Sequence, residues 1–90
     1  MLKLWLLRPV EGLIQDNPWE PWYDKCFGFV ARAETESEAR RFAQDNAGDE
    51  THDQNYADTR MPWLDAAYST CVELIAEGAV GIIIRDFAAA

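Results

Sequence analysis

The chain has 90 residues, of which 49% are hydrophobic and 12% aromatic, and its formal net charge is −8. This aromatic content is too high for a disordered chain, so we expect one globular domain over residues 1–90 with a single thin core. The negative charge argues against direct binding of nucleic acid or an anionic membrane, and favours partners with basic surfaces. No apolar run is long enough for a membrane span, which predicts a cytoplasmic protein.

The first predicted element is a strand at residues 2–7, where leucine occupies every second position before Arg8-Pro9. A loop is expected from Val10 to Asp24, because this stretch carries glycine, proline and an Asp-Asn-Pro turn. Three large aromatics, Trp19, Trp22 and Tyr23, lie beside two prolines in this loop. They form either a buried aromatic lid on the core or an exposed patch at which a partner binds.

Residues 26–34 predict a second strand, with Phe27, Phe29 and Ala31 on one face. The sequence Thr35-Glu-Ser-Glu38 is a capping box, in which the Thr35 hydroxyl accepts from the Glu38 amide and Glu38 reaches back to the Thr35 amide.

A helix at about 36–46 follows the capping box. Ala39, Phe42 and Ala43 are predicted to lay its narrow apolar stripe on the sheet. Arg40 is expected on the charged outer face, and Gly48 is predicted to stop the helix. The next stretch, to Asp58, is polar and acidic, so we expect a solvated loop.

Two interpretations compete for residues 64–77. A helical stripe runs from Leu64 to Ile75, whereas the weak helix formers of 69–72 favour a strand. In the second interpretation this strand forms a hairpin with a last strand at 80–87, which is β-branched and apolar on both faces and is expected in the middle of the sheet. We favour the hairpin.

The order of these elements predicts an α+β fold. It consists of a three- to four-stranded, mainly antiparallel sheet with one helix, about 36–46, packed on one face.

Several of these segments together have a recognisable pattern: Leu4–Pro9, Trp19–Lys25 with Phe27–Val30, Ala33-Glu34 with Ala39-Arg40, Ser69–Cys71 with Glu73-Leu74, and Ile82–Phe87. The pattern resembles a group of short bacterial and phage-type proteins of unassigned function. It covers most of the chain and implies a prokaryotic or viral cytosolic source, but no activity, cofactor or site residue.

No spacing typical of catalysis or metal binding is present. His52 is the only histidine, and it lies in the acidic loop, a poor position for a base that would activate Ser69, Thr70 or Cys71. The loop lacks the ligand pattern of an EF-hand. Cys26 and Cys71 form no metal-binding pair, and in a reducing compartment they are expected to pack as free thiols. We therefore expect no enzyme, no cofactor and no bound metal.

The charge distribution is more informative, because eight acids but only two arginines lie between Glu34 and Asp58. The candidate partner-binding residues are these acids and the loop aromatics: Glu34, Glu36, Glu38, Asp45, Asp49, Glu50, Asp53, Asp58, Trp19, Trp22 and Tyr23. A clustered negative surface attracts basic partners and resembles the charge line of a nucleic-acid backbone.

The leading hypothesis is a non-enzymatic protein that binds a basic, nucleic-acid-binding partner, with a phage inhibitor of the anti-CRISPR or nucleic-acid-mimic kind as its concrete version. One alternative is a small-ligand-binding module or weak enzyme. Its pocket would be walled by aromatics and anchored by polar groups, namely Trp19, Trp22, Tyr23, Trp63, Asp24, Lys25 and Arg85. A third is a homodimer formed through a sheet edge or the aromatic patch.

Overall fold

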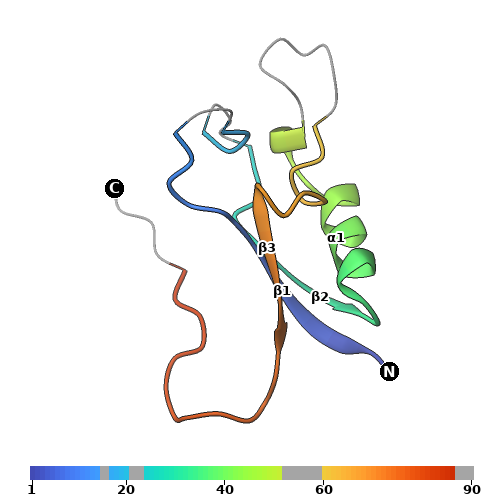
Figure 1. Cartoon of the computed structure of the whole chain (residues 1–90), viewed down its shortest axis with the longest axis vertical. Coiled ribbons are helices and arrows are strands. Elements are labelled where there is room, and N and C mark those ends of the chain that lie inside the picture. The colour runs from blue at the N-terminus through green and yellow to red at the C-terminus, as the bar shows by residue number, and fades with distance from the viewer. Residues whose placement is uncertain (15–16, 21–23, 52–59, 87–90) are drawn as a thin grey trace.

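The computed structural model describes residues 1–14, 17–20, 24–51 and 60–86, and it shows a small α+β domain (Figure 1). Three strands, β1 (Lys3–Pro9), β2 (Phe29–Ala33) and β3 (Ser69–Leu74), form an antiparallel sheet in the order β2-β1-β3. One helix, α1 (Glu36–Asp45), packs against the sheet, and a short 3-10 turn, η1 (Asp49–Thr51), follows it. The predicted fold class is therefore confirmed, with three strands.

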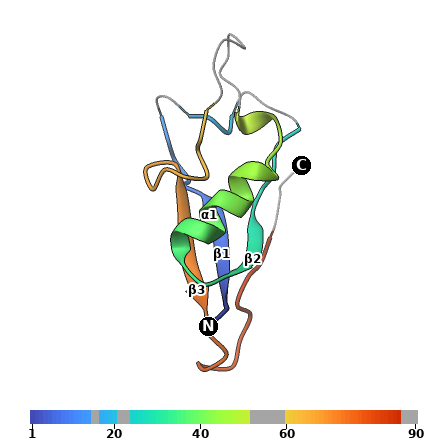
Figure 2. The same cartoon turned by 90° about the vertical axis from the view of Figure 1, so that its right-hand side faces the viewer.

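The central strand β1 determines which side chains face α1. Leu7 stands opposite Phe29 of β2 and Cys71 of β3, and because directly paired residues share a face, these three point to the same side. Alternation then adds Trp5, whose indole nitrogen donates to the Ala33 carbonyl oxygen at 3.0 Å. Figure 2 looks onto this covered face, with α1 lying across all three strands.

The helix begins where the capping box predicts. Thr35 is the N-cap, and its hydroxyl accepts from the Glu38 amide at 3.2 Å. The second half of the box differs, because the Glu38 carboxylate accepts from the Glu34 amide at 3.0 Å and not from Thr35. The Thr35 hydroxyl and the Glu38 carboxylate thus satisfy two amides, those of Glu38 and Glu34, which have no partner within the helix.

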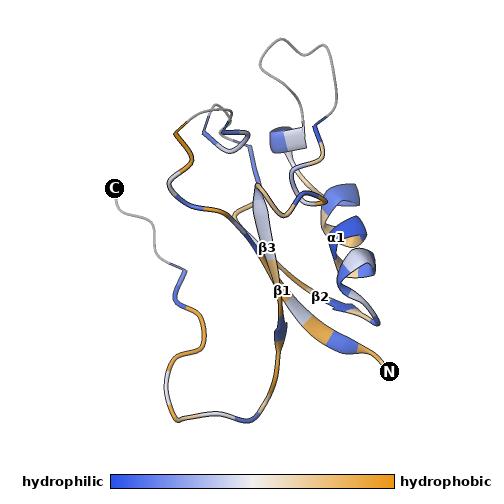
Figure 3. Cartoon of the chain, in the orientation of Figure 1, coloured by the Kyte–Doolittle hydropathy of each residue, from blue (hydrophilic) through white to orange (hydrophobic). Residues whose placement is uncertain are grey.

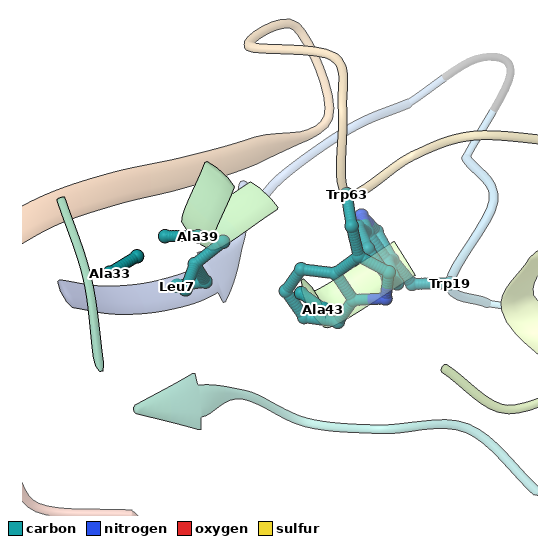
Figure 4. Packing of buried hydrophobic residues seen from close by; sticks show 6 residues of the cluster. All are labelled: Leu7, Trp19, Ala33, Ala39, Ala43 and Trp63. Atoms are coloured by element: carbon teal, nitrogen blue, oxygen red, sulfur yellow. The ribbon is translucent and has the colours of Figure 1, made fainter. Parts of the chain in front are cut away.

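The core is small and has two parts, as Figure 4 shows: Leu7, Ala33 and Ala39 at one end, and Trp63 with Trp19 and Ala43 at the other. The two indole rings meet edge to face, with centroids 4.8 Å apart, a geometry favoured by their quadrupoles. Trp19 also donates from its ring nitrogen to the Tyr68 carbonyl at 3.1 Å. For Trp19, the buried lid is therefore the correct interpretation.

The helical interpretation of residues 64–77 is wrong, because β3 occupies Ser69–Leu74. The predicted hairpin partner at 80–87 is also wrong for the described residues, since none of residues 75–86 belongs to a strand. The two positions beside β1 are filled by β2 and β3, so the middle of the sheet is closed to a further strand. Val80 and Ile82 are instead largely exposed.

The helix ends with Asn46 as its C-cap, and Gly48 has another role than the predicted helix stop. A Cβ atom at Gly48 would lie 2.4 Å from the Asp24 carbonyl oxygen and 3.1 Å from the Lys25 Cα. Both are backbone atoms, which cannot rotate away. Glycine is therefore required here because the segment after the helix crosses close to the chain ahead of β2.

We predict that Gly48→Ala lowers the free energy of unfolding by about 1–3 kcal/mol, the usual cost of forcing an added methyl into a filled space. The denaturant midpoint with an unchanged m-value measures this. Gly81→Ala is the matched control, because nothing lies within 4 Å of a Cβ atom at that position. Equal midpoints for the Gly48→Ala variant and the wild type would contradict the close approach.

Candidate functional site

Four of the eight predicted acids form an exposed surface around α1, which we call the acidic helix face. They lie just before the helix, in its first turn and at its last residue, and are Glu34, Glu36, Glu38 and Asp45. Within the described residues Glu36 pairs with Arg40, at 2.8 Å, while the other three form no ion pair. Asp53 and Asp58 lie outside the described residues.

Two acids of the predicted site lie on η1, and one of them is not a surface residue. Asp49 is half-buried, whereas Glu50 is fully buried. The Glu50 carboxylate accepts from the Trp63 ring nitrogen at 2.8 Å and from the Cys26 amide at 3.1 and 3.2 Å. The assignment of Glu50 to a partner-binding surface is therefore wrong. The tight 3-10 turn directs its side chain inward, where it links the chain before β2 to the core tryptophan.

Arg40 is the second correction, because it is only 7% exposed and does not belong to the charged outer face. Its guanidinium donates to the Ser69 hydroxyl at 2.8 Å and to the carbonyl oxygens of Ser69 and Trp63 at 3.1 Å each. Arg40 lies three residues before Ala43 and thus on the same side of the helix. Phe42, which was predicted to face the sheet, is 49% exposed instead.

Gln44 continues this polar contact along the helix. Its side-chain oxygen accepts from the Trp63 amide at 3.2 Å, and its nitrogen donates to the Arg60 carbonyl at 2.9 Å. Every buried side-chain nitrogen and oxygen among the described residues has a partner. The charged interior groups thus join α1, η1 and β3 through their hydrogen bonds. Their burial was not predicted from the sequence, because each belongs to a residue type usually found at the surface.

The aromatic residues do not assemble as the small-ligand alternative requires. Trp63 is fully buried. Trp19 borders a groove of about 300 Å³ together with Lys25, but only 6% of the residue is exposed, so little of its ring is available to a ligand. Lys25 donates from its ammonium to the Trp19 carbonyl oxygen. Trp22 and Tyr23 lie outside the described residues. Trp19 is therefore a core anchor and does not belong to an exposed patch.

The candidate nucleophiles are held in structural contacts or are weakly ionised. Ser69 is buried, and its hydroxyl donates to the Pro62 carbonyl at 2.8 Å. Burial, followed by the nearby Glu50 carboxylate, raises the pKa of the Cys26 thiol. Burial is also the main cause that raises the pKa of Cys71. Both thiols are free.

Neither a metal site nor a membrane span is found in the described part of the chain. Among those residues, no group of three or more histidines, cysteines and acids lies close enough to hold a metal ion. No helix there is long and apolar enough to cross a membrane.

Fold and site together define a small α+β domain with a three-stranded antiparallel sheet, one covering helix and an acidic surface on that helix. Comparison with protein-family models, with curated proteins and with solved structures finds no match to this chain.

We predict that Arg40→Met lowers the free energy of unfolding by about 2–4 kcal/mol, because the Ser69 and Trp63 carbonyls would stay buried without their donor. Arg41→Met is the matched control, since the neighbouring arginine is exposed and the charge change is identical. It should stay within about 0.5 kcal/mol of the wild type. Denaturant unfolding measures both, and equal losses in the two variants would contradict the role of Arg40.

We further predict that Cys26 reacts with iodoacetamide more slowly in the folded than in the unfolded chain near pH 8, because its raised pKa leaves less thiolate. Glu50→Gln removes the nearby negative charge and should speed the Cys26 reaction by about two- to fivefold. Mass spectrometry of tryptic peptides gives the rate at each thiol.

Two controls separate this charge effect from a general loosening of the fold. Cys71 should keep its rate in the Glu50→Gln variant, since Glu50 is not among the causes of its pKa shift. Asp49→Asn should leave the reaction rate of Cys26 unchanged, because Asp49 is not among the causes of the Cys26 pKa shift. Equal acceleration of both thiols would show that the carboxylate acts only through stability.

Proposed function

We propose that this chain is a non-enzymatic interaction protein, and that its acidic helix face binds a basic surface on a larger partner. In the more concrete version the partner is a nucleic-acid-binding protein of the cytoplasm. The chain is then a phage-encoded inhibitor of host defence, of the anti-CRISPR or nucleic-acid-mimic kind. The groups with which the partner binds phosphates would then bind the carboxylates of the acidic helix face.

The observation that carries this proposal is the exposure of acids at both ends of α1, of which only Glu36 forms an ion pair within the described residues. Helix stability accounts for those in the first turn, where Glu36 and Glu38 meet the positive end of the helix dipole. It does not account for Asp45. This carboxylate lies in the last turn, where the dipole disfavours a negative charge by about 0.3–1 kcal/mol, and no basic residue accompanies it there.

The spacing also suits a partner that binds nucleic acid. A helix of ten residues is about 15 Å long, which is the axial distance that four or five nucleotides of one strand cover at about 3.4 Å each. Carboxylates at its two ends therefore lie over a distance similar to that of a short run of phosphates. Such charges increase the association rate with a basic surface more than they slow dissociation.

The interior chemistry supports a binding role over a catalytic one. Ser69 is occupied by backbone and arginine contacts, and the thiols of Cys26 and Cys71 have raised pKa values. A nucleophile needs either a neighbouring base or a lowered pKa. The described nucleophilic side chains named here have neither.

The test is a triple neutralisation of Glu34→Gln, Glu38→Gln and Asp45→Asn, which keeps side-chain size and leaves a hydrogen-bond acceptor at position 38. A partner is first captured on the wild-type chain from a lysate of the source cell and then purified. We expect the triple variant to bind it about 10- to 100-fold more weakly at low salt, mainly through a slower association rate, and to show a smaller salt dependence.

A matched triple variant, Glu11→Gln, Glu20→Gln and Glu77→Gln, removes the same charge from exposed positions away from α1. It should bind nearly as the wild type does. Equal weakening in both variants would show that only net charge matters, and unchanged binding in the helix variant would overturn the proposed surface. Competition by duplex DNA tests the nucleic-acid-mimic version separately, because a mimic and DNA would exclude each other.

A further inference from the structure

The face of the sheet opposite α1 is largely apolar, and no helix of the described residues covers it. In register, Leu6 stands between Val30 and Val72, and Leu4 stands beside Leu74. We call these five residues the outer apolar face. Val30 and Val72 are each 57% exposed and Leu4 is 39% exposed. A sheet with one solvated face normally places polar residues on it, so this pattern is unusual for a surface that stays in water.

The segment after β3 carries further exposed apolar residues, and we call residues 75–86 the C-terminal arm. Figure 1 shows the arm on the side of the sheet away from α1, and Figure 3 shows how much of it is hydrophobic. Ile75 is 65% exposed, Val80 is 105% exposed, Ile82 is 81% exposed and Ile83 is 73% exposed. Apolar and β-branched residues are usually found inside sheets. Within the described residues, these four residues of the arm lie outside the sheet.

The arm approaches the sheet near its end. Arg8 and Asp86 lie 3.8 Å apart, and a groove of about 240 Å³ lies beside them, lined by Leu6, Val30 and Ile84 among others. Ile84 is 37% exposed, so the arm buries part of this residue, while its other isoleucines are more exposed. Within the described residues, Val30 and Val72 on the face and most of the arm thus remain accessible to a second molecule.

The accessible area of the chain is larger than that of a folded monomer of its mass. The chain exposes 6684 Å², whereas a monomer of 10.3 kDa is expected to expose about 5,400 Å². The difference, roughly 1,300 Å², is a property of the whole chain, and for comparison each partner in a standard interface buries roughly 800 Å². The radius of gyration, 13.9 Å, is also above the roughly 12 Å expected for a compact domain of this length.

The charges are arranged so that two copies can approach through this face. The outward positions of the three strands carry two arginines, Arg8 and Arg32, and no acid. The acidic helix face lies on the other side of the sheet (Figure 1). Two chains of charge −8 that meet through their outer faces therefore keep their most negative surfaces far apart, where solvent and salt screen them.

We propose that the occupant of this face is a second copy of the same chain. In the resulting dimer, the two outer apolar faces pack together around a two-fold axis, and each C-terminal arm lies over the partner. A two-fold interface requires a surface that is complementary to itself. This chain presents an uncovered apolar face and an uncovered apolar segment, and the segment of one copy can cover the face of the other. The dimer does not depend on the function proposed for the acidic helix face.

The first test is the mass of the wild-type chain by sedimentation equilibrium, from about 1 to about 100 µM, a range over which a reversible dimer changes population. We expect the mass to rise from 10.3 kDa to twice that value. A mass of 10.3 kDa at every concentration would overturn the proposal, and so would growth beyond a dimer, because a two-fold contact closes on itself.

The second test places charges on the proposed face. Val30→Lys with Val72→Lys adds four positive charges across the two-fold axis to a face that already carries Arg8 and Arg32, and should weaken self-association by about 100-fold or more. Phe42→Lys is the matched control, since Phe42 is also an exposed apolar residue, at 49%, but lies on α1. It should dimerise as the wild type does. A persistent dimer in the double variant, or loss of the dimer in the control, would show that another surface is used.

A third variant keeps the test decisive if the double valine variant fails to fold, which circular dichroism would reveal. Ile82→Asp with Ile83→Asp changes only the arm, outside every strand and helix, so the fold should remain. We expect dimerisation to weaken by about tenfold or more, and unchanged self-association would remove the arm from the interface. The triple variant of the acidic helix face should remain a dimer, so that failure of one proposal does not affect the other.

Discussion

The buried guanidinium of Arg40 is the interaction on which the packing of this small fold depends. It extends from α1 to the start of β3 and to the Trp63 carbonyl, so that one side chain joins the helix, the sheet and the chain between them. The helix offers only alanines to the core at positions 39 and 43, and such short side chains bury little apolar area. Directed hydrogen bonds therefore complement the limited hydrophobic contact.

The buried carboxylate of Glu50 also joins separate parts of the chain at Trp63. The carboxylate accepts from the indole nitrogen and from the Cys26 amide, and the ring itself packs against Trp19 and Phe29. Two charged side chains thus approach one tryptophan from different elements. A core of this size gains few kcal/mol from burial alone, and fully satisfied polar contacts help to define one arrangement of its parts.

The two faces of the sheet differ in both cover and charge. The inner face lies under a helix whose outer side is acidic, while the outer face is apolar and carries arginines. This separation places the two proposed surfaces on opposite sides of the molecule. A basic partner at the helix and a second copy at the sheet would therefore not compete for the same residues.

The local sequence by itself determined two strands and the helix, because alternation and capping act between near neighbours. Its bounds for the strands were less exact: the first, predicted at 2–7, runs from Lys3 to Pro9, and the second, predicted from Cys26 on, begins only at Phe29. It also determined which acids flank that helix. Only the tertiary structure decided that Arg40 and Glu50 turn inward, since their partners, Ser69 and Trp63, are distant in the chain. It likewise decided the fate of the arm: strand propensity at 80–84 is local, but a strand forms only by pairing with a neighbour, and no described residue of the arm pairs with the outer edge of β2 or β3.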